Sequence, residues 1–331
     1  MMTSDLSVLI LGGGTMGGDI ASSFAAVGAR THVMSPSAST RELLPKRMHK
    51  AFATLNADPA LAAVATTYAA LADVPWGEID LVIESVTENL ALKQQLFAQL
   101  EDMARPGVPL VTNTSTFHIS DIASGLRPDT RKRVAGLHYF MPAHLVPLVE
   151  IVRSEWTDDA VLDELERCTR IAHKAPIRVS KDIAGFIGNR LQAALLREAL
   201  YLVEIGATTA QGVDDAVRFG FGFRFMACGP MKQREFAGWD GHLRSGNALY
   251  PELCATGRHG EMLHQMVAGG KLGVKTRQGF WRYTEEQVAV EKAEYDRKLL
   301  AAFEILRPEL EATNSEQLAA TSAMKGCASR A

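Results

Sequence analysis

The chain has 331 residues, of which 35 are basic and 38 acidic, giving a formal net charge of −3. This length exceeds what one ordinary hydrophobic core holds, so we expect two or three domains. The near balance of charge provides no cationic field of the kind that nucleic-acid-binding proteins use, and we expect a small-molecule partner instead.

Neither the first residues nor the cysteines carry a targeting or metal-binding signal. The opening MMTSDLSVLI lacks the basic segment of a signal peptide, and no apolar run reaches the roughly 18 residues of a membrane span. The cysteines at positions 168, 228, 254 and 327 lack the CxxC spacing of zinc and redox sites. We therefore expect a cytoplasmic protein with reduced cysteines, no metal and no membrane partner.

A glycine cluster follows the first predicted strand, residues 7–11, and precedes a helical pattern that ends at Gly28. Gly12, Gly14 and Gly17 match G-x-G-x-x-G, in which the glycines allow a tight turn, close approach to a pyrophosphate and close helix packing. The N–H groups at the start of the helix would bind the anion. This arrangement predicts a dinucleotide-binding loop, with a merely flexible glycine turn as the alternative. The cofactor contacts predicted here are Gly12, Gly14, Thr15, Met16 and Gly17.

The second predicted strand, residues 29–35, ends in Ser35 where an acidic residue usually binds the ribose hydroxyls of NAD. Arg41, Lys46 and Arg47 follow on the next predicted helix. Ser35 and these basic residues could accept the 2′-phosphate of NADP, or the basic residues could be ordinary solvated side chains. The residues alone leave NAD and NADP open.

Further apolar runs alternate with a helical pattern over residues 87–104. The runs cover residues 79–86, 109–116, 132–140 and 146–152. Strands that alternate with helices predict an α/β, Rossmann-type, doubly wound parallel sheet, with ligands bound beyond the carboxyl ends of the strands.

Polar residues stand near two of these predicted strand ends. Ser115 follows the run PLVTNT and His138 follows RVAGL, so both are expected to face the nicotinamide end of the crevice, although a serine after a strand is more often a turn residue. Residues 136–151 are apolar almost throughout, yet they include both His138 and Glu150. A histidine paired with a buried carboxylate can act as a general base. The alternative is a strand-end histidine and an edge glutamate that faces water.

From residue 181 the pattern becomes helical. Residues 184–206 and 209–222 have helical spacing, and a charged helical pattern runs from residue 285 to 310. The composition of residues 321–331 predicts disorder. The expected domains are a nucleotide-binding domain over 1–180, an all-helical domain over 181–283, and a C-terminal helix with a disordered tail over 284–331.

Seven segments occur in an order that is far more specific than any one of them. They are LGGGTMGGDIA, VTENLALK, NTST, GLHYFMP with LVEI, AGFIGNRLQ, CGPMKQREFAGWDG and KLGVKTRQGFWRY. In these motifs the chain resembles the 3-hydroxyacyl-CoA dehydrogenase family over about residues 7–283. The resemblance implies a Rossmann-type domain, a helical domain that forms a homodimer, and NAD-dependent interconversion of L-3-hydroxyacyl and 3-ketoacyl groups in fatty acid metabolism.

The same resemblance implies roles for individual residues, and it favours NAD as the cofactor over NADP. The implied catalytic residues are His138 as the base, Glu150 as its carboxylate partner, and Ser115 and Asn189, which also bind substrate. The implied cofactor contacts, besides the glycine loop and Ser35, are Glu88, Lys93 and Asn113.

Two departures from the family pattern bear on the substrate. Met141 replaces the asparagine that usually precedes the proline of this motif, which makes the neighbouring pocket more apolar. The segment after Ser35 is shorter than the helical hairpin of long-chain acyl-CoA members, although Lys46, Arg47 and Lys50 could still bind CoA phosphates.

A third feature favours an alternative substrate. Arg224, in GFGFRF, resembles the corresponding region of the L-gulonate 3-dehydrogenase (lambda-crystallin) and carnitine dehydrogenase groups, where an arginine could bind a free carboxylate. The first hypothesis is therefore a 3-hydroxyacyl-CoA dehydrogenase and the second a dehydrogenase of a small free 3-hydroxy acid. A non-catalytic, crystallin-like cofactor-binding protein is the third.

Overall fold

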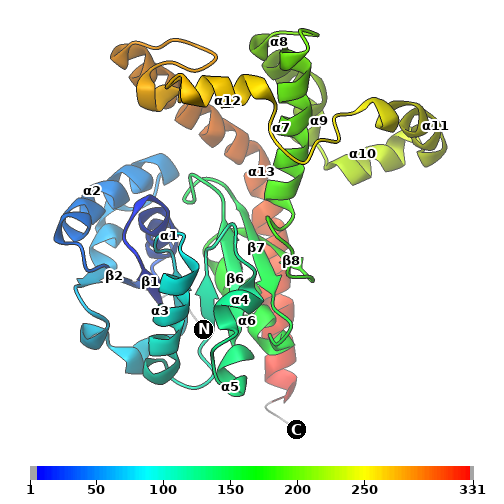
Figure 1. Ribbon diagram of the computed structural model, residues 1–331. Helices are drawn as coiled ribbons and strands as arrows, with labels where there is room; N and C mark the ends of the chain where they lie inside the picture. Colours follow the sequence, from blue (N-terminus) through cyan, green and yellow to red (C-terminus); the bar gives the residue numbers. More distant parts are fainter. Residues whose placement is uncertain (1–5, 329–331) are drawn as a thin grey trace. The chain divides into compact units, whose positions relative to one another are not determined.

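The computed structural model describes residues 6–328, and the chain divides into two compact units. The first contains the chain up to Ile187 together with the segment from Leu299, and the second is Gly188–Lys298. Figure 1 follows the chain from the first strand in blue to the long final helix in red. The first unit thus extends past the predicted boundary at residue 180 and includes most of the predicted third domain.

The first unit is built on one eight-stranded sheet with strand order β3-β2-β1-β4-β5-β6-β7-β8. All neighbouring strands run parallel except β6 and β7, which are antiparallel. The strands are β1 (Ser7–Leu11), β2 (Arg30–Met34), β3 (Ala65–Tyr68), β4 (Leu81–Glu84), β5 (Leu110–Thr112), β6 (Val134–Tyr139), β7 (Leu148–Arg153) and β8 (Ala175–Val179). The predicted doubly wound α/β sheet is confirmed. The two outermost strands, β3 and β8, were not predicted, because each has exposed positions and lacks a long apolar run.

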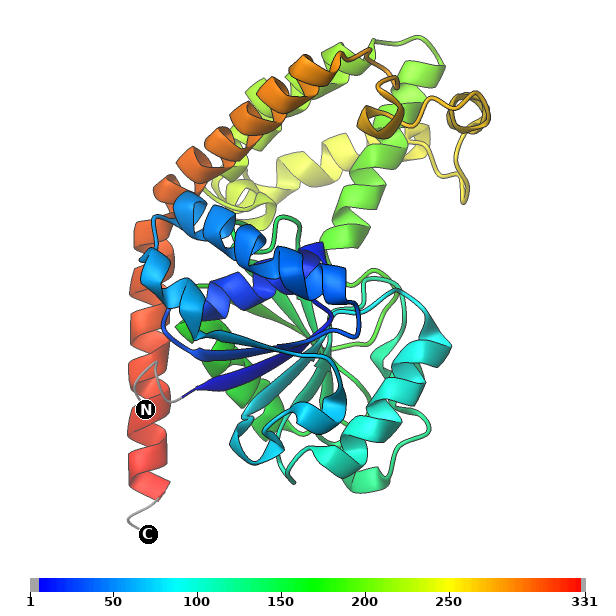
Figure 2. The ribbon, with the colours of Figure 1, turned by 90° about the vertical axis from the view of Figure 1, so that its left-hand side faces the viewer.

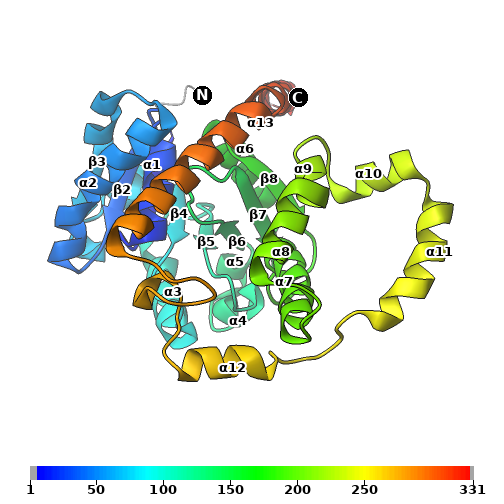
Figure 3. The ribbon, with the colours of Figure 1, turned by 90° about the horizontal axis from the view of Figure 1, so that it is seen from above.

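Helices cover both faces of this sheet (Figure 3). On one side lie α1 (Thr15–Ala25), α2 (Ala38–Leu55) and α6 (Asp159–Ile171), and on the other lie α3 (Leu90–Met103), α4 (Ile119–Ala123) and α5 (Pro128–Arg131). Alternate residues of β1 join opposite cores: Val8 and Ile10 pack with Phe24 of α1, and Leu9 packs with Phe97 of α3. All of β1 is buried, as expected for a parallel strand covered on both faces.

The final helix, α13 (Glu285–Ala328), returns to the sheet unit from Leu299 onward and runs alongside it (Figure 2). Its buried Asn314 accepts a hydrogen bond from Nη1 of Arg170 at 2.9 Å and donates one to the carbonyl of Lys174 at 3.0 Å. The helix continues well beyond Leu310, where the sequence predicted its end, and the predicted disordered tail is helical up to Ala328. The alanines and long side chains of this segment are good helix formers. Residues 329–331 of that predicted tail lie outside the described residues.

The second unit is helical and has little interior of its own. It contains α7 (Gly188–Glu204), α8 (Ala210–Asp215), a π-helix (Ala216–Phe221), α9 (Gly222–Phe225), α10 (Pro230–Ala237), α11 (Trp239–Leu249), α12 (Glu261–Ala268) and the first part of α13. Within this unit α10 and α11 form an arm that extends away from α7 (Figures 1 and 3). Phe219, Phe223 and Phe236 are 74, 71 and 75 % exposed, and the buried apolar core residues of the described chain all precede residue 188.

No helix between residues 6 and 328 combines the length and the hydropathy that crossing a bilayer requires.

Candidate active site

The glycine loop between β1 and α1 has the shape that a pyrophosphate requires. Gly12 has a φ of +104°, and a Cβ there would lie 2.5 Å from the carbonyl oxygen of Ser85. A Cβ on Gly17 would lie 1.8 Å from the carbonyl oxygen of Gly12, whereas one on Gly14 would meet open space. No side chain caps the first turn of α1, so its N–H groups remain available to an anion. The loop therefore fits the phosphates of a dinucleotide, and Thr15 and Met16 begin the helix that presents these N–H groups.

Directly beside this loop, β2 ends at Ser35. The side chain of Ser35 is buried, and a Cβ on Gly13 would lie 3.7 Å from the Cβ of Ser35. Two arginines of α2 also reach this place: Arg41 donates from Nη1 to the carbonyl of Ser35 at 2.6 Å, and Arg47 donates from Nη1 to the carbonyl of Gly13 at 2.9 Å. The predicted cofactor residue Ser35 thus lies next to the glycine loop with two guanidinium groups nearby.

His138 and Glu150 form a buried hydrogen-bonded pair. They face each other in the register of β6 and β7, and Nδ1 of His138 lies 2.7 Å from Oε2 of Glu150. His138 is 4 % exposed and Glu150 is fully buried. The second carboxylate oxygen, Oε1, accepts the backbone N–H of Ile187 at 2.9 Å. The imidazole also packs edge-on against Phe140 and Phe186, so its orientation is fixed from three sides.

This contact determines which ring nitrogen can do chemistry. An ionised carboxylate only accepts hydrogen bonds, so Nδ1 carries the proton and Nε2 presents its lone pair. Within the described residues Nε2 has no hydrogen-bond partner. The pair is therefore arranged as a proton acceptor whose positive charge, once formed, would be balanced by Glu150.

One detail of the predicted placement was wrong. His138 was expected directly after its strand in a parallel sheet, but it lies inside β6, one residue before the strand ends, and β7 runs antiparallel to β6. The antiparallel return is the reason that residues twelve positions apart come face to face.

The loop after β5 carries two of the predicted site residues. Asn113 accepts the backbone N–H of Tyr139 through Oδ1 at 2.9 Å, and so ties this loop to the strand immediately after His138. Asn113 was predicted to contact the cofactor; in the structure its amide oxygen holds β6. Ser115 is exposed, and its hydroxyl makes no hydrogen bond within the described residues, so it can bind a ligand.

A residue that the sequence analysis missed, Glu84, lies at the end of β4. Its fully buried carboxylate accepts two hydrogen bonds from Nζ of Lys93 at 2.7 and 2.8 Å, one from the hydroxyl of Thr112 at 2.6 Å and one from the N–H of Val86 at 2.7 Å. A glutamate at the end of an apolar strand, nine residues before a lysine on a predicted helix, was the signal that could have revealed this pair. Lys93 is 1 % exposed, and its Nζ contacts carboxylates of the protein. The sequence had predicted that Lys93 contacts the cofactor.

Lys93 also connects this buried pair to the loop that carries Ser115. Nζ of Lys93 lies 3.2 Å from Oε2 of Glu88, whose Oε1 accepts the backbone N–H groups of Ser115 and Thr116 at 3.2 and 3.1 Å. Burial raises the pKa of the Glu88 carboxyl, but the hydrogen bond from the Thr114 hydroxyl and the charge of Lys93 more than offset this, so the pKa lies below its usual value. Glu88, predicted as a cofactor contact, therefore supports the loop as an ionised group.

Two further predicted site residues belong to the helical unit. Asn189 is the second residue of α7, and Arg224 lies in α9. In the orientation of the Gln233 side-chain amide that satisfies both its oxygen and its nitrogen, the oxygen accepts a hydrogen bond from Nη1 of Arg224 at 2.9 Å. The roles of Asn189 and Arg224 in binding substrate stay predictions.

No cluster of His, Cys, Asp and Glu side chains suited to a metal ion occurs among residues 6–328.

The buried charges around Lys93 yield a stability prediction. Lys93→Met leaves Glu84 charged and without its cation, so we expect the free energy of unfolding to fall by about 3–5 kcal/mol. In the double variant Lys93→Met/Glu84→Gln the uncompensated charge is gone, and part of that loss should be recovered. Urea unfolding at neutral pH measures both, with Lys46→Met on the exposed side of α2 as the control, expected within about 0.5 kcal/mol of the parent. A Lys93→Met variant as stable as this control would show that the pair is not needed.

Comparison with known proteins identifies the family. The NAD binding domain of 3-hydroxyacyl-CoA dehydrogenase matches residues 7–183, and the C-terminal domain of the same enzyme matches residues 185–283. A 3-hydroxybutyryl-CoA dehydrogenase from Clostridioides difficile is 29 % identical over 293 residues, which cover 85 % of this chain and all of that protein.

A second kind of relative is equally similar. A 5-formyl-3-hydroxy-2-methylpyridine 4-carboxylate 5-dehydrogenase from Mesorhizobium japonicum is 30 % identical over 227 residues, 69 % of this chain and 73 % of that protein. The crystal structure of an enzyme with this activity, described as an NAD⁺-dependent dismutase, superposes with a TM-score of 0.82 at 28 % identity, covering 92 % of this chain and 98 % of the other. On the two domain matches together, the chain is an oxidoreductase that belongs to the 3-hydroxyacyl-CoA dehydrogenase family.

Proposed function

We propose that this chain interconverts an L-3-hydroxyacyl and a 3-ketoacyl group by hydride transfer, with His138 as the acid and base. The observation that carries the proposal is the 2.7 Å contact between Nδ1 of His138 and Oε2 of Glu150, which leaves Nε2 as the proton acceptor. The carrier of the acyl group is proposed to be CoA, in keeping with the names of relatives that match most of this chain.

The oxidation of a secondary alcohol sets the task of the side chains. A nicotinamide cofactor held at the glycine loop would supply the acceptor for the hydride that leaves carbon. The proton must leave the alcohol oxygen at the same time, and Nε2 of His138 accepts it. Glu150 keeps the other nitrogen protonated and balances the positive charge of the ring, so the proton can be returned when the reaction runs toward the alcohol.

The substrate oxygen also needs hydrogen-bond donors as it becomes a ketone. The free hydroxyl of Ser115 is proposed as one donor, and Glu88 holds its loop through the N–H groups of Ser115 and Thr116. Asn189, at the start of α7, is proposed as a second donor.

Replacing His138 tests this mechanism. In His138→Gln we expect kcat to fall by at least ~100-fold, because a positioned acid and base contributes about that much. Cofactor binding should stay within about twofold of the parent, because the glycine loop lies on other strands. Steady-state assays and cofactor titration measure the two quantities, and the exposed His49→Gln provides a matched control with unchanged turnover. Turnover close to the parent value in His138→Gln would exclude His138 from the role.

A small free acid is the second candidate substrate. It is supported by the pyridine carboxylate dehydrogenase, whose structure superposes on 92 % of this chain with a TM-score of 0.82. The region after β2 agrees with it, because α2 is a single helix of 18 residues rather than a hairpin. Arg224 would bind the carboxylate.

A substrate panel separates the two candidates. The first candidate predicts that acetoacetyl-CoA is reduced and that Arg224→Met leaves its KM within about threefold, because a thioester offers no free carboxylate. The second predicts that free 3-keto acids or pyridine carboxylates react, acetoacetyl-CoA does not, and Arg224→Met raises KM by about tenfold or more. A chain that binds cofactor and turns over neither class would support the crystallin-like alternative.

The chain is also proposed to form a homodimer through its helical unit. Phe219, Phe223 and Phe236 are exposed in a unit that has almost no buried interior, and contact with another protein surface would remove them from water. A second copy of the chain would bury the same residues on both copies. The cytoplasmic location and the role in fatty acid metabolism expected from the sequence stay predictions.

Solution mass tests the dimer. Light scattering of the purified chain should give twice the mass of one chain. In Met231→Lys/Phe236→Lys, which places charges on exposed apolar positions of α10, the mass should shift toward the monomer, whereas the control Met103→Lys on α3 should remain dimeric. A parent chain with the mass of one copy would contradict the proposal.

A further inference from the structure

We infer that Arg41, with Ser35 and Arg47, forms a subsite for the 2′-phosphate of NADP(H), so that the chain binds NADPH at least as tightly as NADH. The inference deepens the proposed function, because it rests on a nicotinamide cofactor bound at the glycine loop.

The first observation is what stands at the end of β2. Dinucleotide-binding folds that select NAD place a carboxylate here, which binds the ribose hydroxyls and repels a 2′-phosphate. Ser35 is 5 % exposed, its side chain lies against Gly13, and its hydroxyl has no hydrogen-bond partner within residues 6–328. The side chain that would face the adenosine ribose is therefore an uncharged hydroxyl that can still donate a hydrogen bond.

The second observation is the placement of the Arg41 guanidinium. Its Nη1 donates to the carbonyl of Ser35 at 2.6 Å, which fixes the cation at the end of β2. This bond uses one of five guanidinium N–H groups, and no carboxylate forms an ion pair with Arg41 in the described chain. A planar, fixed guanidinium with free N–H groups is suited to bind a phosphate through two parallel hydrogen bonds.

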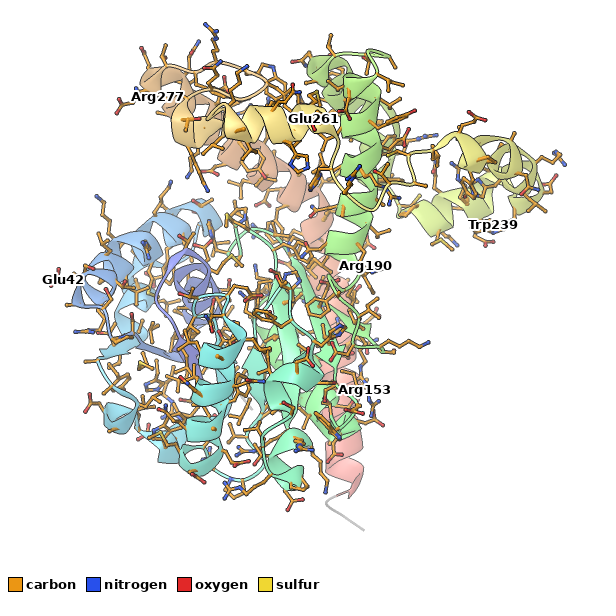
Figure 4. The ribbon with its side chains drawn as sticks, viewed as in Figure 1. Glu42, Arg153, Arg190, Trp239, Glu261 and Arg277 are labelled. Carbon is orange, nitrogen blue, oxygen red and sulfur yellow. The ribbon has the colours of Figure 1, made fainter. Side chains whose placement is uncertain are left out.

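The third observation is that the Arg41 guanidinium belongs to the N-terminal part of α2, where the helix dipole disfavours a positive charge. Helix α2 begins after Ser37, whose hydroxyl caps the N–H of Thr40, so Arg41 follows directly on the first turn. The positive end of the helix dipole lies there, and the first turn contains no acidic residue. Glu42 lies on the outer side of α2 (Figure 4). An anion beside Arg41 would offset both the charge of its side chain and the dipole.

Arg47 adds a second charge to the same place. It donates from Nη1 to the carbonyl of Gly13 at 2.9 Å, and its Cδ would lie 3.7 Å from a Cβ on Gly18. Its guanidinium therefore lies over the glycine loop on the side of α2, again without an ion pair among the described residues. Two cations, neither of them in an ion pair among residues 6–328, thus lie near the end of β2, which favours the cofactor that carries the additional phosphate.

Direct binding of NADPH and NADH, measured by isothermal titration calorimetry, tests the inference without depending on turnover. The parent chain should bind NADPH with a Kd equal to or below that of NADH. Arg41→Met should raise the Kd of NADPH by about tenfold or more, because the contact with the 2′-phosphate is lost. The Kd of NADH, which has no 2′-phosphate, should stay within about twofold of the parent value. Arg30→Met is the matched control: Arg30 lies at the opposite end of β2, beside Glu78, and its loss should change neither Kd.

Ser35→Asp is a second variant, which adds a negative charge where Arg41→Met removes a positive one. The added carboxylate should raise the Kd of NADPH by about tenfold or more and leave the Kd of NADH unchanged or lower. A parent chain that binds NADH tenfold more tightly than NADPH, or an Arg41→Met variant that loses both cofactors equally, would overturn the inference and leave the proposed function intact. A parent chain that binds neither cofactor would overturn both.

Discussion

The hydrogen bond between His138 and Glu150 depends on the one antiparallel pairing in an otherwise parallel sheet. In a parallel arrangement a crossover would separate the two residues, but the short return from β6 to β7 brings them opposite each other. A fully buried carboxylate is costly unless its oxygens are satisfied, and here one accepts Nδ1–H of His138 and the other the N–H of Ile187. The proposed proton acceptor therefore exists because the sheet reverses direction at β7.

A second buried charge cluster lies at the carboxyl edge of the same sheet. Glu84 and Lys93 neutralise each other at the end of β4, and Lys93 continues to Glu88, which holds the backbone of the loop after β5. Asn113 of that loop holds β6 just after His138. The end of β4, the loop after β5 and strand β6 are thus fixed to one another by polar contacts at the carboxyl edge of the sheet, where parallel α/β folds bind their ligands.

Most of this arrangement could be predicted from local pattern. The spacing of Gly12, Gly14 and Gly17 has a steric cause that operates within a few residues. A histidine and a glutamate are unusual in an apolar segment, so His138 and Glu150 could be identified from the sequence. The outer strands β3 and β8 could not be predicted in the same way, because strand edges need fewer apolar residues. The buried state of Lys93 was also hidden, since its partner Glu84 comes from another element and only the packed fold removes both from water.

The central claim is that His138 and Glu150 act as one unit in proton transfer, and a double-mutant cycle on kcat tests it most directly. His138→Gln, Glu150→Gln and the double variant should be compared under saturating substrate and cofactor. If the carboxylate acts only through the imidazole, the double variant should have the same kcat as His138→Gln, so that the two losses are strongly non-additive. Losses that multiply in the double variant would show that the two side chains act independently and would contradict the account.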